Sequence, residues 1–340
     1  MDMDKKVSKL LTYSTLILSF IIMGCEKMFI QPKYTDTPTE NFEILWKELD
    51  EKYSFFIYKN IDWKTIYNQY KPMVNDNMSD EELFEVMNQM LFHLKDGHVN
   101  LTAPFNTTRY WEFFLNAPAN FNYDVILRNY FNNQHKITEY GNFQYIKLGD
   151  IGYVYIPSFS GANFNYFSYV IDEFKNCKAI IVDIRNNGGG DPINAETIAK
   201  FFCPSKRIYA YWQWKNGPGH NDFTAPIPYF IESSSNPYTK PVALLTNRST
   251  FSAANDFTLM MKQLEQVTII GDTTGGGGGV PYKKELPNGW TYRFSRTLTL
   301  DPQMNNVEFG IAPDIVQYMD SNDINNGKDA IIEKALQILN

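Results

Sequence analysis

A serine at position 252 stands where an apolar run meets the start of a helical pattern, in the run TFSAAND (residues 250–256). Residues 242–245 predict a buried strand, and residues 253–264 predict a helix. The first turn of a helix has unpaired backbone N–H groups and a partial positive charge, which suit a developing oxyanion. Ser252 is therefore a candidate nucleophile for acyl transfer. The alternative is a helix-capping serine, since serine is a favoured N-cap residue.

Two residues far from Ser252 in sequence could complete such a site. His98, in the run DGHVN, is a candidate general base because the ordinary pKa of histidine lies near neutrality. The alternative is a structural histidine. Glu308, in the run EFGIAPD, could orient an imidazole or bind a substrate amine. Its alternative is a surface carboxylate before a turn.

A glycine-rich turn follows a second apolar run, in the sequence DIRNNGGGD (residues 183–191). A strand, a glycine turn and a helix resemble a phosphate-binding loop, but neither common nucleotide-binding signature is present, which disfavours nucleotide binding. Consecutive glycines also let backbone N–H groups face a substrate carbonyl at close range. We expect Asp183 and Arg185 to shape this turn rather than perform chemistry.

The composition excludes several other classes of protein. The 340 residues carry a net charge of −7 with no long basic run, which disfavours nucleic-acid binding. The four histidines are scattered, and no CxxC or HExxH motif is present, so we expect neither a metal site nor a cofactor. Cys177 and Cys203 are expected to be ordinary packed thiols.

The N-terminus has the pattern of a targeting segment. Lysines at positions 5, 6 and 9 precede an apolar stretch, residues 10–23, which is too short for an ordinary membrane-spanning helix. It ends in IMGC, which resembles a bacterial lipobox whose cysteine, Cys25, is lipidated after cleavage. We predict a signal peptide over residues 1–24, a tether over 25–40 and a lipid anchor in the bacterial cell envelope, at the outer membrane or periplasmic face. The alternative is a plain signal peptide or anchor helix with an incidental cysteine.

The remaining chain divides into two predicted parts. Residues 41–103 show apolar positions at three- and four-residue spacing, which predicts a small helical domain. Residues 104–340 alternate strand and helix patterns from residue 151 onward, which predicts a mixed α/β core. Within it, residues 205–240 suit a lid or a long excursion near a binding cleft.

Six runs, in this order, resemble the C-terminal processing (tail-specific) proteases and the catalytic core of tricorn protease. They are LKDGHVNL, IIVDIRNNGGGD, LLTNRSTFSAAND, IIGDTTGGGGG, EFGIAPDI and GKDAIIEKAL. The resemblance implies a core of the ClpP/crotonase type and a peptide or unfolded protein as substrate. It also implies that Ser252 is the nucleophile, with an oxyanion hole formed by the Ala253 N–H and a glycine N–H from Gly188 or Gly189.

The resemblance further separates two ways of activating the serine. One branch of the family uses a lysine in a glycine-rich turn after the serine, but residues 275–279 contain none. The tricorn-like branch uses a histidine with a neighbouring serine and a distant glutamate, which His98 and Glu308 match. Gly97 stands where that branch has its serine. Residues 104–150 are too few for a PDZ domain, which needs roughly a hundred residues, near the usual domain size.

The sequence therefore predicts a serine endopeptidase of the cell envelope that works through an acyl-enzyme. A second hypothesis is a non-catalytic module of the same fold that binds a peptide, lipid or glycan, as interphotoreceptor retinoid-binding protein binds apolar ligands. The aromatic residues between positions 205 and 230 would suit such a groove. A third hypothesis is an esterase or amidase that uses the same serine, although the GxSxG elbow of α/β-hydrolases is absent.

Overall fold

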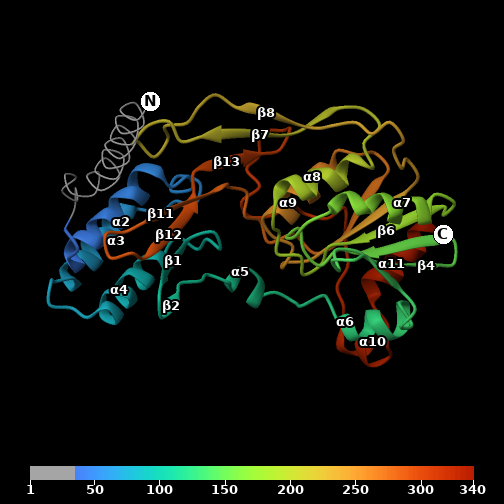
Figure 1. The fold of residues 1–340 in the computed structure, drawn as a ribbon, viewed down its shortest axis with the longest axis horizontal. Coiled ribbons are helices and arrows are strands. Elements are labelled where there is room, and N and C mark those ends of the chain that lie inside the picture. The colour runs from blue at the N-terminus through green and yellow to red at the C-terminus, as the bar shows by residue number, and fades with distance from the viewer. Residues whose placement is uncertain (1–34) are drawn as a thin grey trace, which may run out of the picture.

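The computed structural model describes residues 35–340, which form two lobes joined by extended segments (Figure 1). The predicted signal peptide, Cys25 and most of the tether lie outside the described residues. Within residues 35–340, no helix is both long enough and apolar enough to cross a bilayer.

The helices of the N-terminal lobe begin where the sequence carries helix-start signals. The Thr37 side chain accepts a hydrogen bond from the N–H of Glu40 at the start of the first helix. Ser79 and Glu82 form a capping box at the start of the last of these helices. The elements are α2 (Pro38–Lys52), α3 (Trp63–Tyr70), η1 (Lys71–Met73) and α4 (Asp80–Phe92).

A four-stranded antiparallel sheet completes this lobe, and half of it comes from much later in the chain. The strand order is β11-β12-β1-β2, and Leu101 of β1 pairs with Tyr292 of β12. Leu286 and Trp290, from the turn between β11 and β12, are buried in the same hydrophobic cluster as the helices. The N-terminal lobe therefore includes a hairpin from within the predicted 104–340 range. The strands are β1 (Asn100–Ala103), β2 (Asn106–Thr107), β11 (Pro281–Glu285) and β12 (Thr291–Ser295).

The second lobe is built on a seven-stranded sheet, so the mixed α/β class predicted from the sequence is confirmed. The order is β14-β10-β9-β6-β5-β4-β3. The first five strands are parallel to one another, β4 pairs antiparallel with β5, and β3 pairs antiparallel with β4. The strands are β3 (Lys136–Ile137), β4 (Gln144–Leu148), β5 (Ile151–Tyr155), β6 (Ala179–Asp183), β9 (Val242–Thr246), β10 (Val267–Gly271) and β14 (Ile315–Val316).

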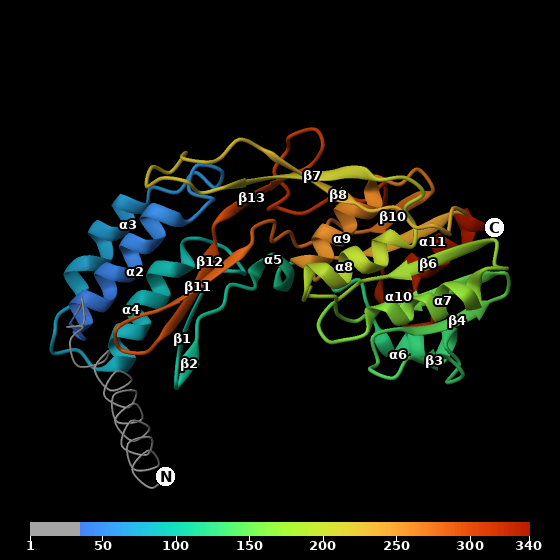
Figure 2. The same ribbon diagram turned by 45° about the horizontal axis from the view of Figure 1, so that its top comes forward.

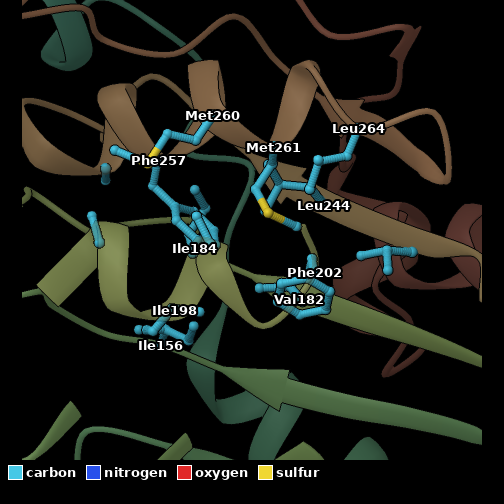
Figure 3. Close-up of a cluster of buried hydrophobic side chains, with 14 of the residues drawn as sticks. Ile156, Val182, Ile184, Ile198, Phe202, Leu244, Phe257, Met260, Met261 and Leu264 are labelled. Atoms are coloured by element: carbon cyan, nitrogen blue, oxygen red, sulfur yellow. The ribbon is translucent and has the colours of Figure 1, made fainter. Parts of the chain in front are cut away.

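Helices cover both faces of this sheet because its central strands are apolar on both sides. Val182 and Leu244 face a cluster that includes Phe257 and Met260 of α9, as Figure 3 shows. Ile181 lies in the opposite cluster, against α11. One face carries η3 (Phe164–Tyr166), α7 (Phe167–Phe174), α8 (Pro192–Lys200) and α9 (Ala253–Lys262), and the other carries α6 (Tyr123–Val125), η2 (Ile126–Tyr130), α10 (Ser321–Asn325) and α11 (Ala330–Leu339).

Several segments run between the lobes, as both ribbon views show, and two of them contain secondary structure of their own (Figures 1 and 2). The first includes α5 (Glu112–Leu115). The second is the hairpin of β7 (Arg207–Trp214) and β8 (Ile227–Ile231), which pairs with β13 (Thr297–Leu300) and which we call the strap.

The loop of the strap contacts the N-terminal lobe. His220 Nε2 lies 2.9 Å from Asp50 Oδ1, and the His220 ring lies 4.4 Å from the ring of Phe56. The segment predicted as a lid or excursion is therefore a β-hairpin that links the two lobes.

A fully buried arginine orders the turn after β6. The Arg185 guanidinium binds Asp183 and Asp329, with shortest N–O distances of 2.6 Å and 2.9 Å. Asp329 in turn accepts hydrogen bonds from the first N–H groups of α11. These three buried charges stabilise the fold only while all three residues are present, because an unpaired buried charge is costly. The contacts of Asp183 and Arg185 are thus structural, in line with the role expected from the sequence.

Candidate active site

Ser252 has a backbone conformation that few residues other than glycine adopt. Its φ of 57° and ψ of −125° place it outside the usual regions for a side chain, and such conformations are often found at active sites. Two hydrogen bonds hold the segment, from the Ser252 N–H to the Gly276 carbonyl at 2.9 Å and from the Phe251 N–H to the Asn187 carbonyl at 3.0 Å. Both glycine-rich loops therefore fix the position of this serine.

The hydroxyl of Ser252 does not cap the helix. Ser252 occupies the N-cap position of α9, but its side chain accepts no hydrogen bond from the helix. Its Oγ lies 3.0 Å from Nε2 of His98, a residue 154 positions away in the sequence. The structure therefore brings together the predicted nucleophile and the predicted base within hydrogen-bond reach, which is the first geometric requirement for such a pair.

The surroundings of His98 favour a neutral imidazole. The side chain is buried, and burial lowers the pKa of His98 to about 4, against a smaller opposing effect of the Asp96 carboxylate. Arg293 and Lys59 lower this pKa further. A neutral ring at pH 7 can accept a proton from a serine hydroxyl, as a general base must.

The second ring nitrogen of His98 has no orienting carboxylate. Nδ1 is buried and makes no hydrogen bond of good geometry with any of residues 35–340, although the backbone of Gly279 lies close enough to favour the protonated ring. The ring packs against Phe251, with the ring centroids 4.8 Å apart. Asp96 accepts a hydrogen bond from the His98 backbone N–H at 2.7 Å. Packing and the main chain, rather than a hydrogen bond to Nδ1, hold the imidazole.

Glu308 lies near this pair, but its hydrogen bonds go elsewhere. Its carboxylate binds Lys59 Nζ at 2.8 Å and accepts a hydrogen bond from the Gly278 N–H at 3.0 Å. Burial and the nearby Asp96 raise the pKa of Glu308 to about 7, although Lys59 opposes them. The structure thus shows Glu308 supporting the glycine-rich loop 275–279, and it shows no hydrogen bond from Glu308 to the His98 ring.

Lys59 is the residue that sequence reasoning missed. Its Nζ also lies 3.6 Å from Asp96 Oδ2, so one ammonium stands between two carboxylates, and all three side chains are at most 5% exposed. Tyr53 donates a hydrogen bond to Asp96 at 2.8 Å. Although burial lowers the pKa of Lys59, the two carboxylates outweigh it and raise that pKa overall. The local run FFIYKN carries no chemical motif, because the partners of Lys59 are distant in sequence.

Asp96 and Glu308 share this lysine unequally. The pKa of Asp96 is lowered, because Lys59, His98 and the Tyr53 hydroxyl together outweigh its burial. Glu308 has fewer donors, which accounts for its raised pKa despite its shorter contact with Lys59. At neutral pH, Asp96 is therefore more completely ionised than Glu308.

The resemblance leaves open whether Gly188 or Gly189 donates to the oxyanion, and the backbone hydrogen bonds near Ser252 distinguish the two. The Gly189 N–H already donates to the Asn187 side chain at 2.9 Å. Within the described part of the chain, the N–H groups of Gly188 and Ala253 make no hydrogen bond, and both residues line the same cleft as Ser252. Gly188 and Ala253 are thus the pair with donors free for an oxyanion.

Gly189 has a different function in this loop. Its φ is +97°, and a Cβ there would lie 2.9 Å from the Ala253 nitrogen and 2.7 Å from the Phe251 carbonyl oxygen. The absence of a side chain therefore lets the loop approach the start of α9 closely.

The cleft around Ser252 has a volume of about 710 Å³ and walls from several parts of the chain. His98 and Arg293 come from the N-terminal lobe, Ser252 and Gly188 from the α/β lobe, and Trp212 from the strap. A cleft with such walls can hold an extended chain that passes the serine.

The space beside Gly97 is tight. A Cβ at Gly97 would lie 3.0 Å from a ring carbon of Phe251 and 3.1 Å from one of Phe113. These rings would have to shift slightly to admit a side chain.

The described side chains show no arrangement suited to a metal. Within residues 35–340, no group of three or more histidine, cysteine, aspartate or glutamate side chains could hold a metal ion. Cys177 and Cys203 are buried free thiols.

Comparison with known proteins identifies the family of these segments. Residues 150–317 match the model of peptidase family S41, and residues 34–92 match the tricorn protease C1 domain. A crystal structure of a candidate peptidase from Parabacteroides merdae is 43% identical, covers 90% of this chain and 97% of that one, and superposes with a TM-score of 0.84.

More distant relatives agree with this fold. Carboxy-terminal processing protease CtpA of Bacillus subtilis is 29% identical over 174 residues, which cover 50% of this chain but only 35% of CtpA. The chain thus spans about a third of the length of that curated relative. The photosystem II D1 C-terminal processing protease shares the fold at 14% identity and a TM-score of 0.56, over 84% of this chain and 94% of that one.

We predict that catalysis remains active well below the ordinary histidine pKa. Protonation of His98 would remove the base, so kcat/KM should fall only as the pH drops through about 4, rather than through 6.5. The measurement is the pH profile of kcat/KM, with circular dichroism to confirm folding at each pH. Asp256 also lines the cleft, and its pKa, like that of Glu308, is raised to about 7. A limb near pH 6.5 that persists when Glu308→Gln and Asp256→Asn are combined would therefore contradict the buried, neutral ring.

We also predict that Lys59→Met destabilises the protein. Two buried carboxylates would lose their shared cation, so the free energy of unfolding should fall by about 3–5 kcal/mol in urea titrations. Adding Glu308→Gln should recover part of this loss, because one unpaired carboxylate is then removed.

The matched control is Lys175→Met, which breaks an exposed pair with Asp172 and should change the unfolding free energy by about 1 kcal/mol or less. Equal effects of Lys59→Met and Lys175→Met would show that the buried cluster does not stabilise the fold.

Proposed function

This chain belongs to the S41 serine peptidases, and we propose that it is an endopeptidase that cleaves peptides or unfolded proteins through an acyl-enzyme on Ser252. The observation that carries the proposal is the 3.0 Å contact between Ser252 Oγ and His98 Nε2 in an open cleft. Family membership supports the reaction class, and the geometry supports the assignment of roles to residues.

The proposed reaction follows from the donors and acceptors of the cleft. His98 Nε2 accepts the Ser252 proton while Oγ attacks the carbonyl carbon of the peptide. The N–H groups of Gly188 and Ala253 stabilise the oxyanion, and the loss of one such donor would raise the barrier by about 3 kcal/mol. The protonated His98 then gives its proton to the leaving amine. A water molecule, activated in turn by His98, releases the acyl group.

One observation favours a non-catalytic binding module as the second candidate. The Nδ1 atom of His98 makes no hydrogen bond of good geometry with residues 35–340, whereas a carboxylate usually orients a histidine base through this atom. A serine that is not activated would leave a peptide-binding cleft without hydrolysis. The two candidates differ in whether Ser252 reacts with an electrophile.

We further propose that Cys25 is lipidated and anchors the protein in the bacterial cell envelope. The support is the lipobox-like run IMGC at the end of an apolar stretch that follows three lysines, and a subsequent tether without an apolar period. Residues 26–340 would then carry the peptidase outside the cytoplasm.

We predict that Ser252→Ala abolishes peptide hydrolysis, with a loss of at least about a thousandfold in kcat, and blocks labelling by a fluorophosphonate. His98→Ala should cost nearly as much, and the double variant little more, because the two residues act as one unit. Ser249→Ala removes another serine hydroxyl from the cleft wall and should retain activity. Hydrolysis by Ser252→Ala at the rate of the unmodified protein would refute the assignment.

For the anchor, we predict that the full chain expressed in bacteria incorporates radiolabelled palmitate and sediments with membranes. Cys25→Ala should lose the label, whereas Cys203→Ala should keep it, because Cys203 is a buried thiol of the α/β lobe. Labelling that survives Cys25→Ala would contradict the anchor.

A further inference from the structure

One carboxylate in the cleft has no partner, and it lies beside the proposed nucleophile. Asp256 is one helical turn after Ser252, and its N–H donates a hydrogen bond to the Ser252 carbonyl at 3.0 Å. One turn of helix advances about 5.4 Å along the axis. Asp256 and Ser252 line the same cleft. The Asp256 side chain is therefore within reach of a substrate held at Ser252.

We propose that Asp256 forms the end of a specificity subsite that selects lysine or arginine at the residue contributing the scissile carbonyl. This inference rests on the proposed peptidase function and adds the substrate class of the same cleft. The arguments are the missing partner of the carboxylate, the side of the cleft on which it lies and the chemistry of the walls around it.

The Asp256 carboxylate is partly exposed to the cleft, and it lacks a partner. Its Oδ1 is buried and accepts no hydrogen bond from residues 35–340, and the charged neighbour that acts on it is another acid, Glu196. Burial, with a smaller effect of Glu196, raises the pKa of Asp256 to about 7. A buried carboxylate without a cation is costly, so a cationic side chain from a substrate would relieve this cost.

The side of the cleft follows from the chemistry of the leaving group. His98 protonates the departing amine, so the part of the substrate after the scissile bond lies toward His98. Asp256 follows Ala253 on α9, and no charge effect connects it with His98, so it lies away from the leaving-group side. A side chain that reaches Asp256 therefore belongs to the residue on the acyl side of the bond.

The walls of the cleft suit a long side chain with a cationic end. Trp212 of the strap, which is mostly buried, lines the cleft together with Val280 and Asp256. Lysine and arginine have apolar stems that pack on such walls, and their cationic groups can interact with an indole face. Arg293, which also lines the cleft, lowers the pKa of His98 and has no effect on that of Asp256. Arg293 is therefore not the cation that Asp256 lacks.

A structural role for Asp256 explains less of this arrangement. An acidic residue in the first turn of α9 interacts favourably with the helix dipole, as many exposed acids do. That interaction does not require a buried oxygen without a donor. The neighbouring groups that influence Asp256 or respond to it are Glu196 and Tyr209, neither of which is a cation.

The test compares peptides that differ only at the residue before the scissile bond, with arginine, lysine, glutamine, leucine or glutamate there. We expect kcat/KM for arginine and lysine to exceed that for leucine by about a hundredfold, the usual scale for a buried charge pair. In Asp256→Asn, this preference should disappear while hydrolysis of the leucine peptide is retained. Glu196→Gln, the matched control for an exposed acid nearby, should change the preference by less than about fivefold.

A binding measurement separates this inference from the proposed function. The inactive Ser252→Ala variant, titrated calorimetrically with the lysine and leucine peptides, should bind the lysine peptide more tightly, and adding Asp256→Asn should remove the difference. If the protein hydrolyses no peptide but this binding preference is present, the subsite stands and the peptidase proposal fails. If hydrolysis depends on Ser252 but favours leucine, or if Asp256→Asn keeps the lysine preference, the peptidase stands and the subsite is overturned.

Discussion

The cleft depends on one buried ammonium, that of Lys59, between the carboxylates of Asp96 and Glu308. Asp96 holds the backbone of His98, and Glu308 holds the glycine-rich loop through the Gly278 N–H. Because Lys59 belongs to the N-terminal lobe, the position of the base is linked to the folding of that lobe. The loss of Lys59 would leave two buried carboxylates without a cation, so both contacts depend on this one residue.

Burial makes this cluster energetically costly, and it also keeps the proposed base in the neutral form that the reaction needs. An exposed imidazole would be partly protonated near neutrality, whereas burial keeps His98 neutral even though Asp96 opposes the effect. Ser252 is held in an uncommon backbone conformation by both glycine-rich loops, so its hydroxyl meets the imidazole instead of capping α9. The packing of the two lobes offsets the cost of the strained Ser252 backbone and of the buried His98 ring, as is common at functional sites.

The path of the chain accounts for how the two lobes form one cleft. The chain leaves the N-terminal lobe after β2, forms six strands of the α/β sheet and returns as the β11–β12 hairpin to pair with β1. It then adds β14 to the α/β sheet. The strap crosses between the lobes and contributes Trp212 to the wall. Each lobe therefore contains residues that are distant in sequence, and the cleft forms only when both lobes are complete.

The sequence by itself determined the apolar strands, the capped helices, the α/β class and the candidates Ser252 and His98, because these depend on local patterns and residue types. The contact between Ser252 and His98, the choice of Gly188 over Gly189 as the free donor and the pairing of Glu308 with Lys59 were decided only by the tertiary structure. Hydrogen bonds and charge pairs between distant residues leave no local pattern, and burial sets pKa values only once the surrounding chain has packed.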